Sequence, residues 1–370
     1  ATLCIDKPVP KTREGGLVND YARRILLNRL KYLRHGELIL NDGDKQYVFG
    51  RRDAAFAGTV TITITGTAFY TTVLLHGILG AGEAYMNGDW QCDNLTALVE
   101  LVLCNHRYIA SIGPGMKWLT KPLHLVQRYL SRNTLKGSRR NIGAHYDLGN
   151  ELFELFLDRT MMYSCGIFEQ PQVTLAEASE AKLARICEKL QLKPTDHILE
   201  IGTGWGGFAL YAAKHYGCRI TTTTISRQQY DYARQRVREA GLDERITLLC
   251  DDYRLLSGSY DKLVSIEMIE AIGHRHYDTY FAKCSELLRP DGMMLLQSIS
   301  IPDQRYPVAK KSIDFIQRYI FPGGCLPSIA ALSTAIARRT DMRIFLLEDI
   351  GPHYATTLQH WRERFLANID

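Results

Sequence analysis

Three glycines follow an acidic residue in the stretch Leu199 to Gly207, LEIGTGWGG. Gly202, Gly204 and Gly207 fit the spacing G-x-G-x-x-G, which in dinucleotide-binding proteins lets the backbone approach a pyrophosphate. In those proteins an acid about 20 residues further on binds the ribose 2′-hydroxyl. The segment from Arg219 to Tyr230 contains no Asp or Glu. The glycine spacing is a weak signal by itself, and without this acid it does not predict NAD binding.

Glu200 lies directly before these glycines, at the end of a short apolar stretch. An acid in this position followed by G-x-G is the usual pattern of enzymes that bind S-adenosylmethionine (SAM) and transfer its methyl group. Gly202 and Gly204 allow the backbone to approach a ligand closely. A loop at the carboxyl end of a strand is where a parallel sheet binds ligands. We therefore predict that Glu200, Gly202 and Gly204 bind SAM, the alternative being a tight turn without a ligand.

The glycine loop needs a sheet to hold it, and from about residue 195 onward short apolar segments alternate with helical ones. This alternation predicts a parallel sheet with helices on both faces. Ser226 is suited to cap the helix that begins near Arg227, and Gly241 to end it. We expect an α/β fold of the class I SAM-methyltransferase type, with a Rossmann-like doubly wound sheet. The expected strands are HILEI, RITTTTI, ITLLC, KLVSI and MMLLQSI, and the expected helices are GGFALYAAKHYG, RQQYDYARQRVREAG and YDTYFAKCSELLRPDG.

Residues 36–80 have a different pattern, rich in β-forming residues. GELIL and KQYVFG flank NDGD, which signals a hairpin turn, and TVTITIT alternates with period two before FYTTVLL continues the β-rich stretch. NLTALVELVLCNHRY then favours a helix, and SIGPG suits a break between domains. The expected organisation is a small N-terminal α+β domain over residues 1–110, a basic linker over 111–140 and a methyltransferase domain over 141–370.

The composition is that of an ordinary globular protein, with 370 residues, 46% hydrophobic and 23% charged, enough for two domains. No run of about 18 apolar residues predicts a membrane-spanning helix, and the first residues lack the apolar core of a signal peptide. The nine cysteines are scattered without a C-x-x-C pair, which favours reduced thiols in the cytoplasm. His274 and His276 form a His-x-His without a further ligand pattern, and we expect no bound metal.

Positive charge is concentrated in two segments, although the net charge is only +5. Tyr21 to Arg34 is predicted to be a basic amphipathic helix, and such helices bind anionic membranes with about 1 kcal/mol for each nearby Lys or Arg. Solvated surface faces are the alternative. Nucleic acid is a poor candidate because no motif for it is present. The second segment, Leu101 to Tyr146, is expected to bind anionic bilayers together with this helix. It contains no Asp or Glu and carries Arg107, Lys117, Lys121, Arg128, Arg132, Lys136, Arg139 and Arg140.

Several stretches, taken in order, resemble the cyclopropane-fatty-acyl-phospholipid synthases, SAM-dependent enzymes with mycolic-acid-modifying relatives. The likeness covers roughly residues 141–365, and GEAYMNGDW extends it into the lipid-associated N-terminal domain of longer members. It implies methylene addition to the cis double bond of an unsaturated phospholipid acyl chain, by a cytoplasmic enzyme associated peripherally with the inner face of the membrane. A homodimer is an open expectation. The stretches are NIGAHYDLGNELFELFLDRTMMYSCGIFE, LEIGTGWGGFALYAAKHYG, TTISRQQ, DDYRLL, SIEMIEAIG and YIFPGGCLPS.

The resemblance also implies which residues surround SAM. Gly202 and Gly204 would lie against its methionine and ribose portions. Core packing is the alternative for Ile225, and a solvated loop is the alternative for Asp251. The remaining positions are Tyr163 and Ser164 near the SAM carboxylate, Thr224, Ile225 and Gln229 along the ribose and adenine, and Asp251 and Asp252 near the adenine.

Ring closure requires a base, because methyl transfer to an alkene leaves a carbocation that must lose a proton from the new methyl group. Cys165 and Glu270 match family positions that hold a bound bicarbonate ion, which takes this proton. By resemblance Ile299, Tyr354 and backbone groups complete the cradle. Gln297 departs from the family, which has a His there, and an amide forms hydrogen bonds but does not titrate. Without the family, Cys165 is a small apolar residue and Glu270 a helix cap.

Four functions remain open at this point. A cyclopropane synthase is favoured. The same cation chemistry would make the protein a C-methyltransferase with methyl- or methylene-branched products if Gln297 leaves the base site empty. A non-catalytic lipid-binding module is disfavoured by the SAM loop together with Cys165 and Glu270. A methyltransferase acting on a small molecule would not need the basic segments.

Overall fold

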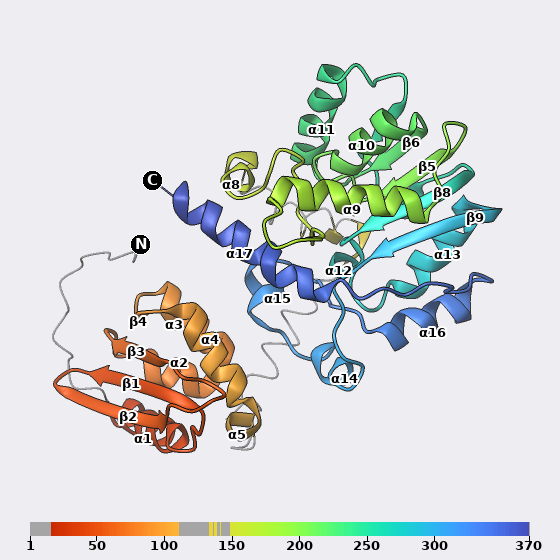
Figure 1. Cartoon of the computed structure of the whole chain (residues 1–370). Coiled ribbons are helices and arrows are strands. Elements are labelled where there is room, and N and C mark those ends of the chain that lie inside the picture. Colours follow the sequence, from red (N-terminus) through yellow and green to blue (C-terminus); the bar gives the residue numbers. More distant parts are fainter. Residues whose placement is uncertain (1–15, 111–132, 136, 139–140, 142–148, 370) are drawn as a thin grey trace. The chain divides into compact units, whose positions relative to one another are not determined.

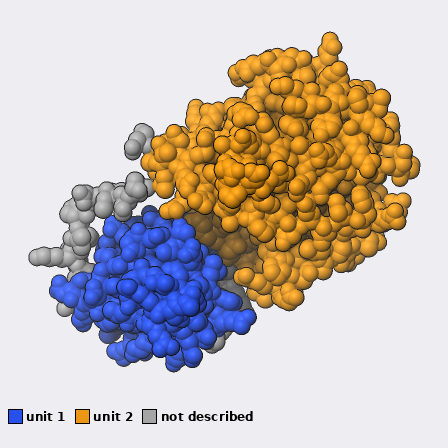
Figure 2. Space-filling model, viewed as in Figure 1, with its two compact units in different colours: residues 1–127 blue, residues 128–370 orange. Residues whose placement is uncertain are grey.

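The computed structural model of the chain describes residues 16–110, 133–135, 137–138, 141 and 149–369. The chain forms two compact units, residues 1–127 and 128–370 (Figure 2). Most of the expected linker over residues 111–140 lies outside the described residues, so the boundaries expected at 110 and 141 remain predictions. Most of the acid-free segment from Leu101 to Tyr146 lies outside them as well.

The N-terminal unit is built on a four-stranded sheet. Its strands are β1 (Gly36–Asp42), β2 (Lys45–Arg51), β3 (Thr59–Ile64) and β4 (Trp90–Cys92). The strand order is β2-β1-β3-β4, and β1 and β2 form the antiparallel hairpin expected around NDGD. β3 is parallel to β1 and antiparallel to β4. Val60, Ile62 and Ile64 of β3 are buried, as its period-two pattern predicts.

Helices cover this sheet, and one of them replaces an expected strand. The described helices of the unit are α1 (Leu17–Leu30), α2 (Phe69–His76), α3 (Ile78–Met86), α4 (Leu95–Cys104) and α5 (His106–Ala110). FYTTVLL lies in α2, so its assignment to the β-rich stretch was wrong. Its Thr and Val residues favour strands, but burial of Phe69, Tyr70 and Leu74 in the core outweighs that preference.

The helix predicted over Tyr21 to Arg34 is α1, which begins four residues earlier and ends at Leu30. Its apolar side packs within the N-terminal unit itself, where Ala22 is fully buried. Arg23 of the same helix forms an ion pair with Asp42 at 2.6 Å. The side of α1 that packs on this core is therefore not free to enter a membrane, while Leu17 and Val18 at the start of the helix are exposed. The partly buried residues of this side are Ile25, Leu26, Leu27 and Leu30.

The C-terminal unit is built on a five-stranded sheet (Figure 1). Its strands are β5 (His197–Ile201), β6 (Arg219–Thr223), β7 (Ile246–Leu249), β8 (Tyr260–Ile266) and β9 (Leu288–Gln297). All neighbours are parallel, in the order β7-β6-β5-β8-β9. This is the expected doubly wound sheet. The direction of winding reverses between β5 and β8, and such a switch point binds ligands outside the carboxyl ends of the strands.

The described helices of this unit are α8 (Asn150–Glu154), α9 (Leu175–Lys189), α10 (Gly207–Tyr216), α11 (Arg227–Glu239), α12 (Ile269–Ile272), α13 (Tyr277–Leu287), α14 (Tyr306–Ala309), α15 (Phe315–Tyr319), α16 (Ile329–Arg339) and α17 (Gly351–Ala367), with the 3-10 helix η1 (Tyr253–Leu255). Ser226 caps α11, accepting from the N–H of Gln229 at 3.3 Å. The expected helix ending in LRPDG stops at Leu287, because β9 already begins at Leu288 and pairs with β8. Its proline cannot donate to a helical hydrogen bond.

Both faces of the sheet are buried, which explains its nearly continuous apolar strands. Ile198 and Val264 pack with α9, α10 and α11 on one face. Leu199 and Leu263, their neighbours along the strands, pack with α12, α13 and α16 on the other. The carboxyl ends of the strands are thereby held rigidly at one edge, where the loops that follow them converge.

Candidate active site

Gly202 and Gly204 shape the loop that follows β5. Their φ angles are +104° and +53°, in the region that favours glycine. The N–H groups of Gly202 and Thr203 both donate to the carbonyl of Thr223 at 3.0 Å, which ties the loop to the end of β6. A Cβ on Gly204 would meet no atom within 4 Å. The backbone there borders open space, so a ligand can approach it closely.

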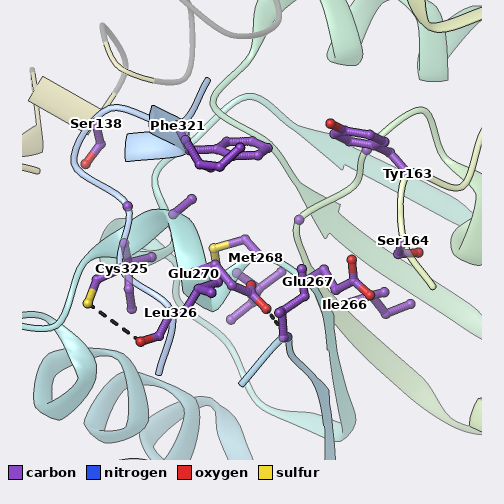
Figure 3. A pocket seen from close by; sticks show the side chains of 18 of the residues that line it. Ser138, Tyr163, Ser164, Ile266, Glu267, Met268, Glu270, Phe321, Cys325 and Leu326 are labelled. Carbon is purple, nitrogen blue, oxygen red and sulfur yellow. Dashed lines mark hydrogen bonds between the residues drawn. The ribbon is translucent and has the colours of Figure 1, made fainter. Parts of the chain in front are cut away.

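A cavity of about 970 Å³ opens at the carboxyl ends of the strands (Figure 3). This volume lies within the range of about 300–1,000 Å³ that is usual for small-molecule sites. All ten residues predicted to bind SAM line the cavity, although their individual roles remain predictions. They are Tyr163, Ser164, Glu200, Gly202, Gly204, Thr224, Ile225, Gln229, Asp251 and Asp252. The residues present therefore fit SAM.

Some of these side chains already have partners within the protein. Thr224 Oγ1 donates to Gln229 Oε1 at 2.9 Å, which holds the loop after β6. Asp252 is 3% exposed and forms an ion pair with Arg254 at 2.6 Å. Asp251, by contrast, is exposed. We therefore expect Asp251 rather than Asp252 to present its carboxylate to a ligand.

Glu200 is buried together with a lysine. Thr222 Oγ1 donates to Glu200 Oε2 at 2.6 Å. Burial raises the pKa of Glu200 to about 8, while Thr222 and Lys182 act in the opposite direction. Lys182 of α9 is fully buried and donates to Ser164 Oγ at 2.6 Å, and burial lowers its pKa to about 8. No sequence signal distinguishes Lys182, because it lies within an ordinary amphipathic helix.

Glu267, which was not predicted as a site residue, lies at the centre of the expected base site. It directly follows β8 and has a φ of +46°. Its Oε1 accepts from the N–H of Cys165 and from Nε2 of Gln297, both at 2.9 Å. Its Oε2 accepts from the hydroxyl of Tyr354 at 3.3 Å. Burial raises the pKa of Glu267, while the hydrogen bonds and Lys182 act in the opposite direction.

The predicted catalytic residues take two kinds of position around Glu267. The lining of the cavity includes Glu267 and Tyr354 but neither Cys165 nor Gln297. Cys165 and Gln297 donate hydrogen bonds to Glu267 from outside this lining. Burial raises the pKa of the Cys165 thiol to about 11, so this thiol is not a nucleophile at neutral pH. Groups of Cys165, Gln297 and Tyr354 that were expected to hold bicarbonate hold a carboxylate of the chain instead. A bicarbonate ion does not fit this cradle as it is arranged.

Glu270 of α12 is a second carboxylate on the same cavity (Figure 3). Its Oε1 accepts from the N–H of Ile299. Its Oε2 is buried without a hydrogen-bond partner among the described residues. Burial and, after it, the nearby Glu267 raise the pKa of Glu270 to about 8. Two such groups titrate as a pair, and we expect the proton to reside on Glu270, which has fewer donors.

These buried carboxyl groups predict that stability falls as the pH rises. The folded-state pKa values of Glu200 and Glu270 are raised to about 8, so the folded chain binds more protons than the unfolded chain between about pH 4.5 and 8. The free energy of unfolding should therefore fall across this window, by up to about 1.4 kcal/mol per pH unit for each group. Lys182, whose folded-state pKa is lowered to about 8, opposes this fall only near the upper end of the window.

Denaturant unfolding of the ligand-free protein between pH 5 and 8 measures this slope. Glu270→Gln should flatten it, whereas Glu239→Gln on the exposed side of α11 should leave it unchanged. An identical slope in wild type and Glu270→Gln would contradict the assigned pKa of Glu270.

The His-x-His sequence lies at the start of α13. The carbonyl of His276 accepts from the N–H of Tyr280 at 2.8 Å, within the first turn of the helix. In the part of the chain that the structure describes, no group of three or more His, Cys, Asp or Glu side chains is placed to hold a metal ion.

The parallel sheet, the glycine loop after β5 and the cavity at the switch point together define a SAM-dependent methyltransferase of the α/β class. The family model described as mycolic acid cyclopropane synthetase matches residues 133–370. The chain belongs to this family.

Individual relatives agree with this assignment. The chain is 39% identical to the tuberculostearic acid methyltransferase UfaA1 of Mycobacterium tuberculosis over 303 residues, which cover 80% of this chain and 70% of that protein. It is 40% identical to the cyclopropane-fatty-acyl-phospholipid synthase of Escherichia coli K12 over 311 residues, covering 83% and 76%. A solved mycolic acid cyclopropane synthase complexed with SAH and CTAB matches with a TM-score of 0.58 and 32% identity, covering 62% of this chain and 84% of that one.

Proposed function

We propose that this protein transfers a one-carbon unit from SAM to the cis double bond of an unsaturated phospholipid acyl chain and closes a cyclopropane ring. The observation that carries the proposal is the shared cavity, which the glycine loop, two buried carboxylates and an apolar wall all line. A small polar substrate would not need such a wall. Its residues include Ile299, Ile301, Val308, Ile316, Phe321 and Leu326.

SAM, when bound, supplies a methyl group on a sulfonium centre that an alkene can attack. The chain has to orient the lipid, exclude water and stabilise positive charge on the acyl chain. The rings of Tyr163 and Phe321 line the cavity (Figure 3), and an aromatic face attracts a cation within about 6 Å of its centre. Glu267 and Glu270 add negative charge on the same cavity.

Ring closure needs one base. The resemblance implies a bicarbonate ion for this role, but Glu267 occupies the contacts that such an ion would need. The role proposed for Cys165, Gln297 and Tyr354 is then to position Glu267, and the role proposed for Ile299 is to position Glu270.

A methyl- or methylene-branched chain is the second candidate product. The similarity to a tuberculostearic acid methyltransferase and the amide at Gln297 favour it. The two reactions share the carbocation and differ in which proton is lost, either directly or after a hydride shift along the chain. A buried carboxylate beside the cavity favours loss of the proton from the new methyl group, and therefore the ring.

The proposal is tested with the purified protein, vesicles of a monounsaturated phospholipid and SAM labelled in its methyl group. Mass spectrometry of the released fatty acids should show the label in a cyclopropane chain that resists ozonolysis. A labelled chain that ozonolysis cleaves would be methylene-branched, and the second candidate would replace the first. An unlabelled lipid pool would contradict both.

We also propose that the protein binds anionic bilayers peripherally through its N-terminal unit. None of the described helices is both long and apolar enough to cross a membrane. Arg24 and Lys31 are exposed on or just beyond α1, and Leu17 and Val18 at its start are 90% and 69% exposed. Basic side chains beside exposed apolar ones suit a lipid surface. A location on the inner face of the membrane and a homodimer remain predictions, the latter measurable by sedimentation velocity.

Arg24→Glu combined with Lys31→Glu should weaken binding to anionic liposomes by roughly thirtyfold or more, since each basic residue contributes about 1 kcal/mol near such a surface and the new carboxylates are repelled by it. Liposome sedimentation at low and high salt measures the change, and wild-type binding should also weaken with salt. Lys214→Glu with Arg234→Glu, on exposed positions of α10 and α11, is the charge-matched control. An equal loss in both double variants would indicate a nonspecific charge effect and contradict docking by α1.

A further inference from the structure

Glu267 combines three features that a purely structural acid would not need. Its carboxylate is buried, it lines the cavity and it accepts from three separate segments, namely those of Cys165, Gln297 and Tyr354. We propose that the Glu267 carboxylate is the base that removes the proton from the transferred methyl group, in place of a bound bicarbonate ion. This inference rests on the proposed function, because it assigns a residue to its ring-closing step.

The hydrogen-bond donors that an external anion would need already bind Glu267. The N–H of Cys165, the amide of Gln297 and the hydroxyl of Tyr354 all point to its two oxygens. A bicarbonate ion at the same place would lose these donors and would lie beside Glu267 and Glu270. Like charges in a buried site repel strongly, so the chain's own carboxylate excludes a second one.

Gln297 fits this arrangement better than a histidine would. Its Nε2 donates to Glu267 and, at 3.4 Å, to the carbonyl of Cys165. An amide donates without ever taking the proton itself. It therefore holds the Glu267 carboxylate in place and leaves the carboxylate as the group that titrates.

The backbone at Glu267 is a second, independent observation. A non-glycine residue in the left-handed region costs about 1–3 kcal/mol, and such residues persist where the surroundings over-determine them, often at active sites. Glu267 adopts this conformation at the point where β8 ends. Its neighbour Met268 contacts the glycine loop, since a Cβ on Gly202 would lie 3.1 Å from Met268 Cγ. The strained turn thus holds the carboxylate at the switch point beside the SAM loop.

Burial raises the pKa of Glu267, and the positive and hydrogen-bonding groups around it act in the opposite direction. Lys182 of α9 attracts the carboxylate, and the donors from the Cys165 loop, β9 and α17 stabilise it. Glu270 of α12 repels it, and Tyr163 lies nearby as a neutral phenol whose pKa is raised to about 12 by burial and then by Glu267. We assign the proton that the two carboxylates share to Glu270, because Glu267 accepts three hydrogen bonds and Glu270 Oε2 has no partner among the described residues. Glu267 is left as the base and Glu270 as a neutral acid.

In the proposed step, the π pair of the lipid double bond forms the bond to the methyl carbon, while the pair of the breaking C–S bond stays on sulfur. The acyl chain then carries one positive charge on the second alkene carbon. Glu267 takes a proton from the new methyl group, and the freed C–H pair forms the second ring bond. The products are a neutral ring and a protonated Glu267, which returns its proton to water before the next turnover.

The first test uses the unaltered protein. Ring-forming turnover is measured in buffer depleted of carbon dioxide and again with added bicarbonate. The expected result is an equal rate in both. A rate that depends on bicarbonate would overturn the inference while leaving the proposed function intact. Absence of any labelled lipid would instead count against the proposed function, so the two failures are distinguishable.

Two variants extend the test. Glu267→Gln should reduce ring formation about a hundredfold or more, the usual contribution of a positioned base, while SAM affinity by calorimetry stays within about twofold of wild type. Glu267→Gly should lose as much ring-forming activity as Glu267→Gln. Added formate or bicarbonate should restore part of this activity, because either ion can enter the space that the carboxylate has left. Glu239→Gln, exposed on α11, should match wild type. Undiminished ring formation in Glu267→Gln would overturn the assignment, and thermal unfolding shows whether each variant is folded.

Discussion

Gly204→Val should weaken SAM binding by about a hundredfold, or roughly 2.7 kcal/mol. The backbone of Gly204 borders open space in the cavity, and a Cβ there meets no protein atom within 4 Å. A branched side chain would therefore occupy the volume that SAM needs without disturbing the packing of the loop. Isothermal titration calorimetry of the purified variant measures the loss directly.

A second glycine provides the matched control. Gly241, after α11, has a φ of +64°, and a Cβ added there would likewise meet no atom within 4 Å, but this glycine does not belong to the cavity lining. Gly241→Val should incur a similar backbone strain and lower the unfolding temperature by a similar amount. Its SAM affinity should stay at the wild-type value. Equal losses of affinity in the two variants would mean that strain, and not occupation of the cavity, explains the effect.

Features with a local physical cause were predictable from the sequence. The strands of the C-terminal sheet are short apolar segments bounded by turn residues, and a glycine loop after the first strand is required for close approach to a ligand. Strand ends in a parallel sheet meet at one edge, so the residues after β5, β6 and β7 were expected to share a site. The cavity does gather Gly202, Thr224 and Asp251 in this way.

Features set by tertiary packing were not predictable. FYTTVLL has strand-like residues but is a helix, because burial against α1 and the sheet outweighs intrinsic preference. The basic helix α1 has an apolar side that could equally face a membrane or a core, and only the structure assigns it to the core. An amphipathic pattern shows that one side of a helix is apolar, but it does not show whether a membrane or the protein core covers that side.

Glu267 shows the same limit within the site. SIEMIEAIG contains two acids three residues apart, Glu267 and Glu270. Only Glu270 matches a catalytic position of the family that the sequence resembles. The position of Glu267 directly after a strand was the available signal, since strand ends supply site residues in this fold. What the sequence could not convey is that Gln297 and Glu267 are hydrogen-bonded partners from neighbouring strands. The departure at Gln297 is explained by this partner.

If Glu267 and Gln297 together replace a bicarbonate site, reversing both should restore one. Glu267→Gly removes the carboxylate and also relieves the left-handed backbone, since glycine adopts that conformation freely. Gln297→His supplies the residue that the family resemblance expects beside the anion. The double variant should be nearly inactive without bicarbonate, and added bicarbonate should raise its ring-forming turnover by about a hundredfold, the usual contribution of a positioned base. Label transfer into cyclopropane chains over a bicarbonate titration measures this.

The single variant Gln297→His shows whether Gln297 or Glu267 excludes the bicarbonate ion. It retains the Glu267 carboxylate, so its turnover should stay independent of bicarbonate, because the cradle is still occupied. A bicarbonate requirement in this variant would show that Gln297 alone excludes the ion, and that Glu267 is a bystander. A double variant that forms rings at the wild-type rate without bicarbonate would show that neither carboxylate is the base. Dependence on bicarbonate in the double variant but not in Gln297→His would assign the base to the position of the Glu267 carboxylate, since the double variant has lost that carboxylate and kept the donors from Cys165 and Tyr354.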